Sequence, residues 1–221
     1  MSNFLTRLLF PPKCHFCRKL LDESETDLCH TCRAEAPEFS HSKRNFQLIA
    51  QWTAVWYYKG NVRNSIRRFK FYNARGYADF YGRALAMKLQ EDPFGDGFDV
   101  LTWVPVSPLR RFTRGYDQAE LLARALGREL GMTPVPGLVK FRHTKPQSGI
   151  RDRALRRANV FNAYRGINPQ AFAGKRVLLV DDVVTTGSTA GECAKMLLVS
   201  GATHVYLAAV AATPNNKAKH K

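Results

Sequence analysis

Two adjacent carboxylates and a turn rich in hydroxyl groups lie together in residues 181–189, and these side chains are the best suited to chemistry. An apolar, β-branched run precedes them and a helical pattern follows, which predicts a strand, a loop and a helix. The first N–H groups of a helix have no intrahelical partner, and the helix dipole adds about half a positive charge there. The turn can therefore seat a phosphate monoester without a lysine. The expected phosphate-binding residues are Thr185, Thr186, Gly187, Ser188 and Thr189.

Asp181 and Asp182 are expected at the carboxyl end of the predicted strand, where open α/β sheets bind their ligands. Two groups that only accept hydrogen bonds suit the vicinal hydroxyls of a sugar or a hydrated divalent cation. A sugar phosphate is thus the predicted ligand. The alternative is a buried strand and an N-capped helix that carry the two acids for structural reasons alone.

Two Cys-x-x-Cys pairs, separated by eleven residues, lie near the start of the sequence. Such pairs place four thiolates around a tetrahedral Zn²⁺, and a segment this short and polar takes most of its folding energy from the metal. The predicted structural zinc ligands are Cys14, Cys17, Cys29 and Cys32. Two disulfides, a redox pair, or His15 or His30 in place of one cysteine are the alternatives. Cys193 follows the apolar phase of the helix after the turn and is predicted as a core residue.

The composition is strongly basic, since 221 residues carry a formal net charge of +16. An excess of this size predicts a polyanionic partner. Arginines interleaved with aromatic residues over positions 61–72 are typical of a track for single-stranded nucleic acid, although an amphipathic helix with core aromatics fits the same pattern. A second basic stretch covers positions 140–165. The nucleic-acid candidates in the two stretches are Arg63, Arg67, Arg68, Lys70, Arg151, Arg153, Arg156 and Arg157.

A strand predicted over residues 100–104 leads into a loop with three arginines, which could bind a diphosphate. The basic stretch over residues 140–159 contains Pro146 and Gly149 and is predicted as a lid that closes over the diphosphate and excludes water. The diphosphate and lid candidates are Arg110, Arg111, Arg114 and Lys145. The alternative for each of them is a solvated surface position.

Strands that alternate with helices predict an α/β fold with a parallel sheet flanked by helices. We expect a zinc knuckle at residues 1–40, a polar linker over 34–48, an α/β domain at 48–212 and a basic tail at 213–221. No apolar run approaches the ~18 residues of a membrane span. The paired cysteines, together with a first apolar run too short for a signal peptide, favour a cytoplasmic protein.

The order of several motifs resembles the ComF family, which includes proteins of the ComFC and GntX types. These motifs are the four-cysteine knuckle, Val104-Pro105-Val106, Arg114-Gly115-Tyr116-Asp117-Gln118, Lys145-Pro146-Gln147, Arg156-Arg157-Ala158-Asn159-Val160-Phe161 and the loop at 181–189. The loop looks like the phosphoribosyl pyrophosphate (PRPP) signature of type I phosphoribosyltransferases. The resemblance implies a type I phosphoribosyltransferase-like domain behind a zinc knuckle. Ser107 replaces a usual proline, and Tyr116-Asp117 replaces a more typical Phe-Asn.

The resemblance also implies a function: a PRPP-binding, phosphoribosyltransferase-like protein that handles incoming single-stranded DNA in natural transformation. Asp181 and Asp182 would then hold the ribose hydroxyls, with Mg²⁺ between sugar and diphosphate. A competence helicase or a recombination mediator is the expected protein partner. The alternatives are an inactive nucleic-acid-binding adaptor and a nucleobase phosphoribosyltransferase unrelated to competence. The sequence contains no recognisable general base or base-binding element, so turnover and the acceptor base stay open.

Overall fold

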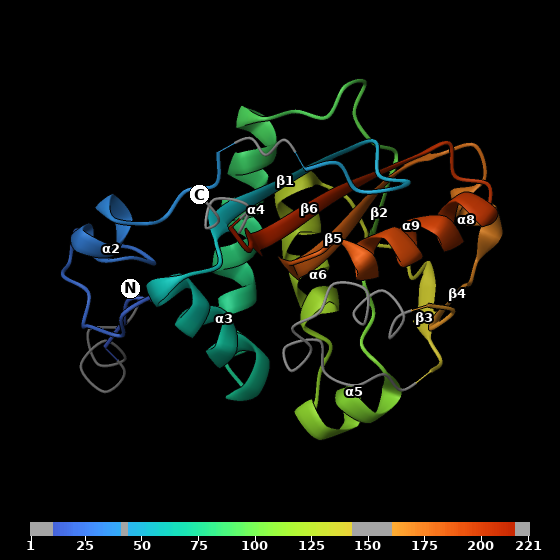
Figure 1. Ribbon diagram of the computed structural model, residues 1–221. Coiled ribbons are helices and arrows are strands. Elements are labelled where there is room, and N and C mark those ends of the chain that lie inside the picture. Colours follow the sequence, from blue (N-terminus) through green and yellow to red (C-terminus); the bar gives the residue numbers. More distant parts are fainter. Residues whose placement is uncertain (1–10, 41–43, 143–160, 215–221) are drawn as a thin grey trace, which may run out of the picture.

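A four-stranded parallel sheet forms the centre of the computed structural model, which describes residues 11–40, 44–142 and 161–214. The strand order is β1-β6-β5-β2 (Figure 1). The strands are β1 (Gln51–Tyr57), β2 (Val100–Trp103), β5 (Arg176–Val184) and β6 (His204–Ala212). The two central strands, β5 and β6, are buried along nearly their whole length, as expected for a parallel sheet covered on both faces.

Helices cover both faces of the sheet, and they create two hydrophobic cores. One face packs against α4 (Tyr77–Glu91) and α6 (Gln118–Leu130), and the other against α9 (Ser188–Val199). Successive residues of β5 alternate between the cores: Leu178 belongs to the first and Leu179 to the second. The remaining elements are α2 (His30–Ala34), α3 (Gly60–Phe71), α5 (Pro108–Arg114), β3 (Leu138–Lys140), β4 (Tyr164–Gly166) and α8 (Pro169–Phe172). The predicted α/β fold with a flanked parallel sheet is confirmed.

In the stretch predicted as a polar linker, residues 34–48, the described residues on both sides of 41–43 include side chains that pack against the edge of the sheet. The backbone N–H of Phe39 donates to the carbonyl of Val55 at 2.9 Å, and the side chain of Phe39 is 4% exposed. Phe46 is 8% exposed. The prediction of a linker was wrong because the few apolar residues in this polar stretch are the ones that the sheet buries.

Two other predictions differ from the structure near the carboxyl ends of the strands. The strand β5 continues to Val184, so Asp181 and Asp182, expected at its carboxyl end, are followed by two more strand residues before the turn. The three arginines predicted on a loop lie on the short helix α5, which starts with Pro108 and ends at Gly115 with a φ of 75°. Proline is favoured at the first position of a helix, and glycine tolerates the left-handed conformation after the last turn.

In the described part of the chain, no helix combines the length and the apolar character needed to span a membrane.

Candidate functional site: a zinc ribbon and the carboxyl edge of the sheet

The four cysteines of the two Cys-x-x-Cys pairs converge on one point. Their Sγ atoms all lie within 4.8 Å of one another, and the Sγ atoms of Cys17 and Cys29 are 3.7 Å apart. A tetrahedral Zn²⁺ with Zn–S bonds of about 2.3 Å would separate the sulfurs by about 3.8 Å. The cluster therefore fits zinc. Neither His15 nor His30 belongs to it, so the predicted ligand set Cys14, Cys17, Cys29 and Cys32 is the one that the structure assembles.

Backbone amides around the cluster favour a thiolate at Cys14. Burial of this thiol opposes ionisation, but hydrogen bonds from the amides of Cys17, Cys29 and Phe16 outweigh burial and lower its pKa to about 7. Zinc binds cysteine as the thiolate, so these amides prepare the site for the metal.

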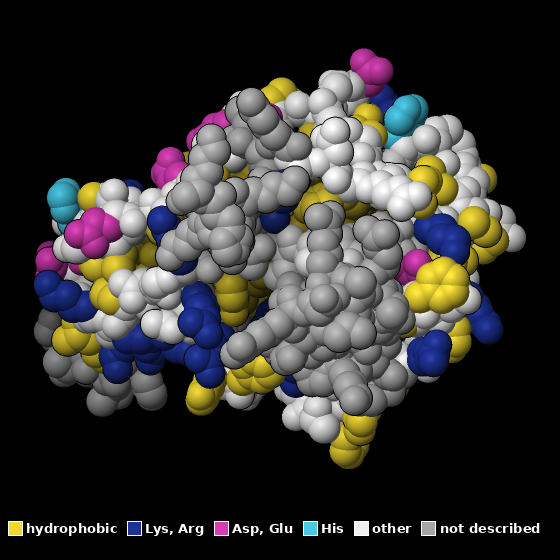
Figure 2. Space-filling model, viewed as in Figure 1, with side chains coloured by type: hydrophobic (Ala, Val, Ile, Leu, Met, Phe, Trp, Pro, Cys, Tyr) yellow, Lys and Arg dark blue, Asp and Glu magenta, His cyan; other side chains and the backbone are white. Residues whose placement is uncertain are grey.

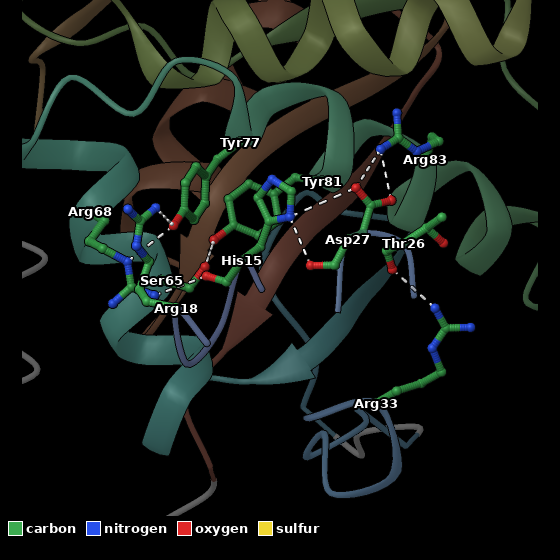
Figure 3. A network of polar contacts seen from close by, with 10 residues as sticks. All are labelled: His15, Arg18, Thr26, Asp27, Arg33, Ser65, Arg68, Tyr77, Tyr81 and Arg83. Carbon is green, nitrogen blue, oxygen red and sulfur yellow. Dashed lines mark hydrogen bonds and ion pairs between the residues drawn. The ribbon is translucent and has the colours of Figure 1, made fainter. Parts of the chain in front are cut away.

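The knuckle is docked onto α3 and α4 through a network of polar contacts (Figure 3). Arg68 of α3 donates to the backbone carbonyls of His15 and Phe16 at 2.9 and 2.5 Å. Arg83 of α4 donates to both carboxylate oxygens of Asp27 at 2.8 Å. The Phe16 ring lies edge-on to Trp56 at 5.2 Å and is 2% exposed. The zinc segment is therefore part of the main hydrophobic core.

The two carboxylates of β5 point to opposite faces of the sheet, because neighbouring residues of a strand alternate. On one face, a carboxylate oxygen of Asp182 lies 2.7 Å from Nζ of Lys70 in α3, and Asp182 is 9% exposed. On the other face, the Asp181 carboxylate accepts a hydrogen bond from the Asp182 amide at 2.8 Å. Burial of the Asp181 carboxyl group, followed by the nearby charge of Asp182, raises its pKa well above the usual range.

A buried lysine faces Asp181 and was missed at the sequence level. Lys140 of β3 is 5% exposed, and its Nζ lies 5.0 Å from the centre of the Tyr164 ring. Burial and the charge of Arg110 lower its pKa to about 8, while Asp181 acts in the opposite direction. Lys140 ends the three-residue strand Leu138-Val139-Lys140, which is too short for a periodic pattern to show that its side chain points inward.

The phosphate loop, residues 185–189, connects β5 to α9 and is partly exposed along its whole length. Gly187 adopts a φ of 76° immediately before the helix, a conformation that glycine tolerates best. The hydroxyl oxygens of Thr186 and Ser188 lie 2.8 Å apart. The predicted strand, glycine turn and helix start are thus present, and the loop is open on at least one side.

The arginines of α5 differ in their contacts. Arg114 donates to Oε1 of Gln118 at 2.7 Å, and its guanidinium lies 4.8 Å from the centre of the Phe71 ring. Burial lowers the pKa of Arg114, and the Asp182 charge works against this effect. Arg111 pairs with Glu120 at 3.3 Å and is largely exposed. Arg110 faces Lys140 on the Asp181 side.

Asp117 serves as a structural cap close to these arginines. Its carboxylate accepts hydrogen bonds from the amides of Ala119 and Glu120, at the start of α6, and from the amide of Val106 at 2.8 Å. It therefore ties the turn after β2 to α6. Beside it, Oγ of Ser107 and Nε2 of Gln118 are buried and make no hydrogen bond within the part of the chain that the structure describes.

The four predicted nucleic-acid residues of α3 are used in different ways. Lys70 pairs with Asp182 and Arg68 holds the zinc knuckle, whereas Arg63 and Arg67 are exposed. Ile66 and Phe69 of the same helix lie in the core, but the aromatic residues Phe71 and Tyr72 are 59% and 71% exposed. One face of α3 therefore packs in the core, and another presents exposed arginines. Lys145, Arg151, Arg153, Arg156 and Arg157, together with residues 143–159 of the predicted lid, lie outside the described residues. Lys140, the first residue of that prediction, is instead buried in β3.

Comparison with known proteins gives a consistent set of relatives. Residues 5–43 match the double zinc ribbon domain. The chain is 29% identical to competence protein F of Haemophilus influenzae, over 94% of this chain and 97% of that protein. It is 25% identical to competence protein ComFC of Bacillus subtilis, over 85% of this chain and 78% of that protein. It is also 38% identical to DNA utilization protein YhgH of Escherichia coli O157:H7, over 49% of this chain and 47% of that protein.

Solved structures that resemble the chain include two enzymes that carry PRPP-related names. Glutamine PRPP amidotransferase from Bacillus subtilis matches with a TM-score of 0.42 and 26% identity, over 62% of this chain and 26% of the enzyme. A hypoxanthine-guanine-xanthine phosphoribosyltransferase matches with a TM-score of 0.36 and 15% identity, over 66% of this chain and 69% of the enzyme.

Full-length similarity to two competence proteins and a double zinc ribbon at the expected residues agree with the sheet and the cysteine cluster described above. Along most of its length the chain resembles proteins of the ComF family.

Proposed function

We propose that the protein binds PRPP with Mg²⁺ at the carboxyl edge of its sheet and acts in the handling of DNA during natural transformation. The observation that carries the PRPP assignment is the placement of the phosphate loop directly after the two carboxylates of β5. Helix-terminal amides and hydroxyls favour the terminal phosphate. The acids are acceptors for ribose hydroxyls and for a hydrated magnesium ion.

The turn after β2 supports a diphosphate position. Buried polar atoms without a partner are rare in native proteins, and each calls for an explanation. Ser107 and Gln118 contribute two such atoms beside Arg114, whose charge is half-buried and close to Asp182. A diphosphate bound to this turn would supply acceptors for these donors and would balance the arginines of α5.

The Lys70–Asp182 ion pair competes with metal binding at Asp182. With Nζ at 2.7 Å from the carboxylate, Lys70 occupies the place that a cation would take. Mg²⁺ with its water shell would have to compete with Lys70 or bind through Asp181 on the other face. We therefore expect Mg²⁺ to bind weakly alone and tightly with PRPP, whose phosphates complete its coordination.

The test is calorimetric titration of PRPP with Mg²⁺ into the wild type and into the double variant Asp181→Asn, Asp182→Asn. The variant should lose at least about 100-fold in affinity, because the sugar and metal acceptors are weakened together. Asp99→Asn is the matched control. It breaks the ion pair with Arg176 at the start of β5, at the opposite end of this strand from the loop. Unchanged affinity in the double variant would refute the assignment, and diphosphate release with a panel of nucleobases would reveal turnover.

A role with DNA is supported by a separate observation. The relatives named above are competence and DNA utilization proteins. Lys and Arg side chains gather over the region of α3 in the lower left of Figure 2. At the end of α3, Phe71 and Tyr72 are exposed, and the guanidinium of Arg114 lies over the Phe71 ring. Arg67 precedes Phe71 by one helical turn. Exposed aromatic rings next to arginines are suited to stacked bases and their phosphates.

Binding of a single-stranded oligonucleotide should therefore weaken steeply with salt, because each phosphate contact releases a counterion. Changing Phe71 and Tyr72 to Ala should weaken binding by about tenfold or more without altering the salt slope, since stacking carries no counterion term. Changing Arg63 and Arg67 to Met should reduce the slope of log affinity against log salt concentration. Fluorescence anisotropy at a series of salt concentrations measures both effects, and a flat salt response in the wild type would exclude phosphate tracking.

A further inference from the structure

A short segment far from the phosphate loop in sequence lies along it in the fold. We name residues 44–47 the strap. Nη1 of Arg44 donates to the carbonyl oxygen of Thr185 at 3.0 Å, across 141 sequence positions. A Cβ placed at Gly187 would overlap the ring of Phe46, and one placed at Gly191 would lie 3.5 Å from the carbonyl oxygen of Gln47. The strap thus follows the loop into the first turn of α9.

The strand β1 holds Arg44 in position. Nε1 of Trp52 donates to the backbone carbonyl of Arg44 at 2.7 Å. The Arg44 guanidinium lies 5.0 Å from the centre of the Trp52 ring and 5.8 Å from that of Phe46. Both its backbone and its side chain are therefore oriented by aromatic residues that pack against the sheet, and Phe46 itself is buried.

The contact with Thr185 determines the direction of a second group. In a planar trans peptide the C=O and the following N–H point in opposite directions. Because the carbonyl of Thr185 faces Arg44, the N–H of Thr186 points away from Arg44. This amide then adds to the helix-terminal donors that attract an anion.

We propose that Arg44 is a positioning residue of the phosphate loop: it sets the Thr185–Thr186 peptide so that the loop accepts the terminal phosphate of a sugar phosphate. The inference rests on the proposed PRPP site and deepens it. The strap makes the loop specific for the monoester end of the ligand. The diphosphate end, held by the turn after β2 and by α5, does not depend on Arg44.

The experiment compares three ligands by calorimetry: PRPP with Mg²⁺, ribose 5-phosphate, and diphosphate with Mg²⁺. Arg44→Met should weaken PRPP and ribose 5-phosphate by about tenfold, the value of one charge-assisted contact, and leave diphosphate within about twofold. Arg44→Lys should recover part of the loss because it keeps the charge and one donor. Arg33→Met is the matched control, since Arg33 also donates to a backbone carbonyl, that of Thr26 at 3.1 Å, far from the loop.

A second variant keeps the test usable if Arg44→Met folds poorly. Trp52→Phe removes the hydrogen bond to the Arg44 carbonyl but keeps Arg44 itself and an aromatic ring at position 52, so it should produce a smaller loss of ribose 5-phosphate binding with diphosphate unchanged. Equal weakening of ribose 5-phosphate and diphosphate, or no weakening, would overturn the role of Arg44 alone if the wild type binds PRPP. A wild type that binds neither PRPP nor ribose 5-phosphate would overturn the proposed site, and the role of Arg44 with it.

Discussion

The zinc ribbon and the carboxyl edge of the sheet differ in the parts of the chain that supply their polar groups. The ribbon takes its four thiols from one short segment, and no distant element contributes a ligand to the described cluster. The carboxyl edge takes its charged groups from α3, β3, β5 and α5, so that it exists only in the complete fold. A site built from one short segment can be predicted from the spacing of its residues. A site built from several elements also depends on the face of its helix or strand on which each side chain lies.

The helix α3 connects the two regions. Arg68 donates to the carbonyls of the zinc knuckle, and Lys70, two residues later, pairs with Asp182. A disturbance of the knuckle therefore has a direct route to the proposed ligand site. Three predictions test how far the two regions differ.

Loss of the metal should have the largest effect. Cys14→Ser, or removal of zinc by a chelator, should lower the melting temperature by at least about 10 °C, because the metal supplies the folding energy of the ribbon and Phe16 belongs to the main core. Differential scanning calorimetry with zinc analysis measures this. Cys193→Ala is the control, since the buried Cys193 lies on α9 and should leave one zinc per chain. A melting temperature that does not change on zinc loss would show the ribbon to be a detachable module.

Lys140→Met should increase stability at pH 7 by up to about 3 kcal/mol, because burial lowers the lysine pKa from 10.5 to about 8. Below pH 8 the folded and unfolded chains both carry the proton, so the full cost of burying the charge is present. Between pH 8 and 10.5 the unfolded chain still binds the proton and the folded chain releases it, so the wild type regains stability as pH rises.

Urea unfolding of the wild type and of Lys140→Met at pH 7 and pH 10 tests this prediction. The readout is the difference in unfolding free energy between the two proteins at each pH. Lys175→Met, on an exposed residue, is the control and should show no such pH dependence. A variant less stable than the wild type at pH 7 would mean that Asp181 repays the cost of burial, and the carboxyl edge would then be a structural ion pair.

Arg83→Met should have the smallest effect, about 1 kcal/mol or less, since the bidentate pair with Asp27 is partly exposed to water. The zinc content should not change. Chemical unfolding at low and high salt would show the wild-type advantage shrinking as salt screens the pair. A loss of zinc in this variant would show that docking onto α4, and not the metal alone, holds the ribbon together.

Much of the fold and half of the site could be predicted from residue patterns. The ribbon ligands, the parallel sheet and the glycine turn before α9 all depend on local spacing and on apolar periodicity, which neighbouring residues express directly. The opposite directions of Asp181 and Asp182 were not predicted, because both acids were expected to bind one ligand at the carboxyl end of the strand. The strap was missed because residues 34–48 have a polar composition, and the buried positions of Phe39 and Phe46 follow only from their contact with the sheet.

The sequence by itself determined which groups are present: four thiols at zinc spacing, a turn rich in hydroxyl groups and an excess of positive charge. The tertiary structure decided their partners, since it brought Lys70 to Asp182, Lys140 to the opposite face, and Arg44 to the carbonyl of Thr185. The physical reason is that hydrogen bonds and charge pairs act over a few ångströms, and a linear sequence specifies such distances only within a single turn, strand or helix.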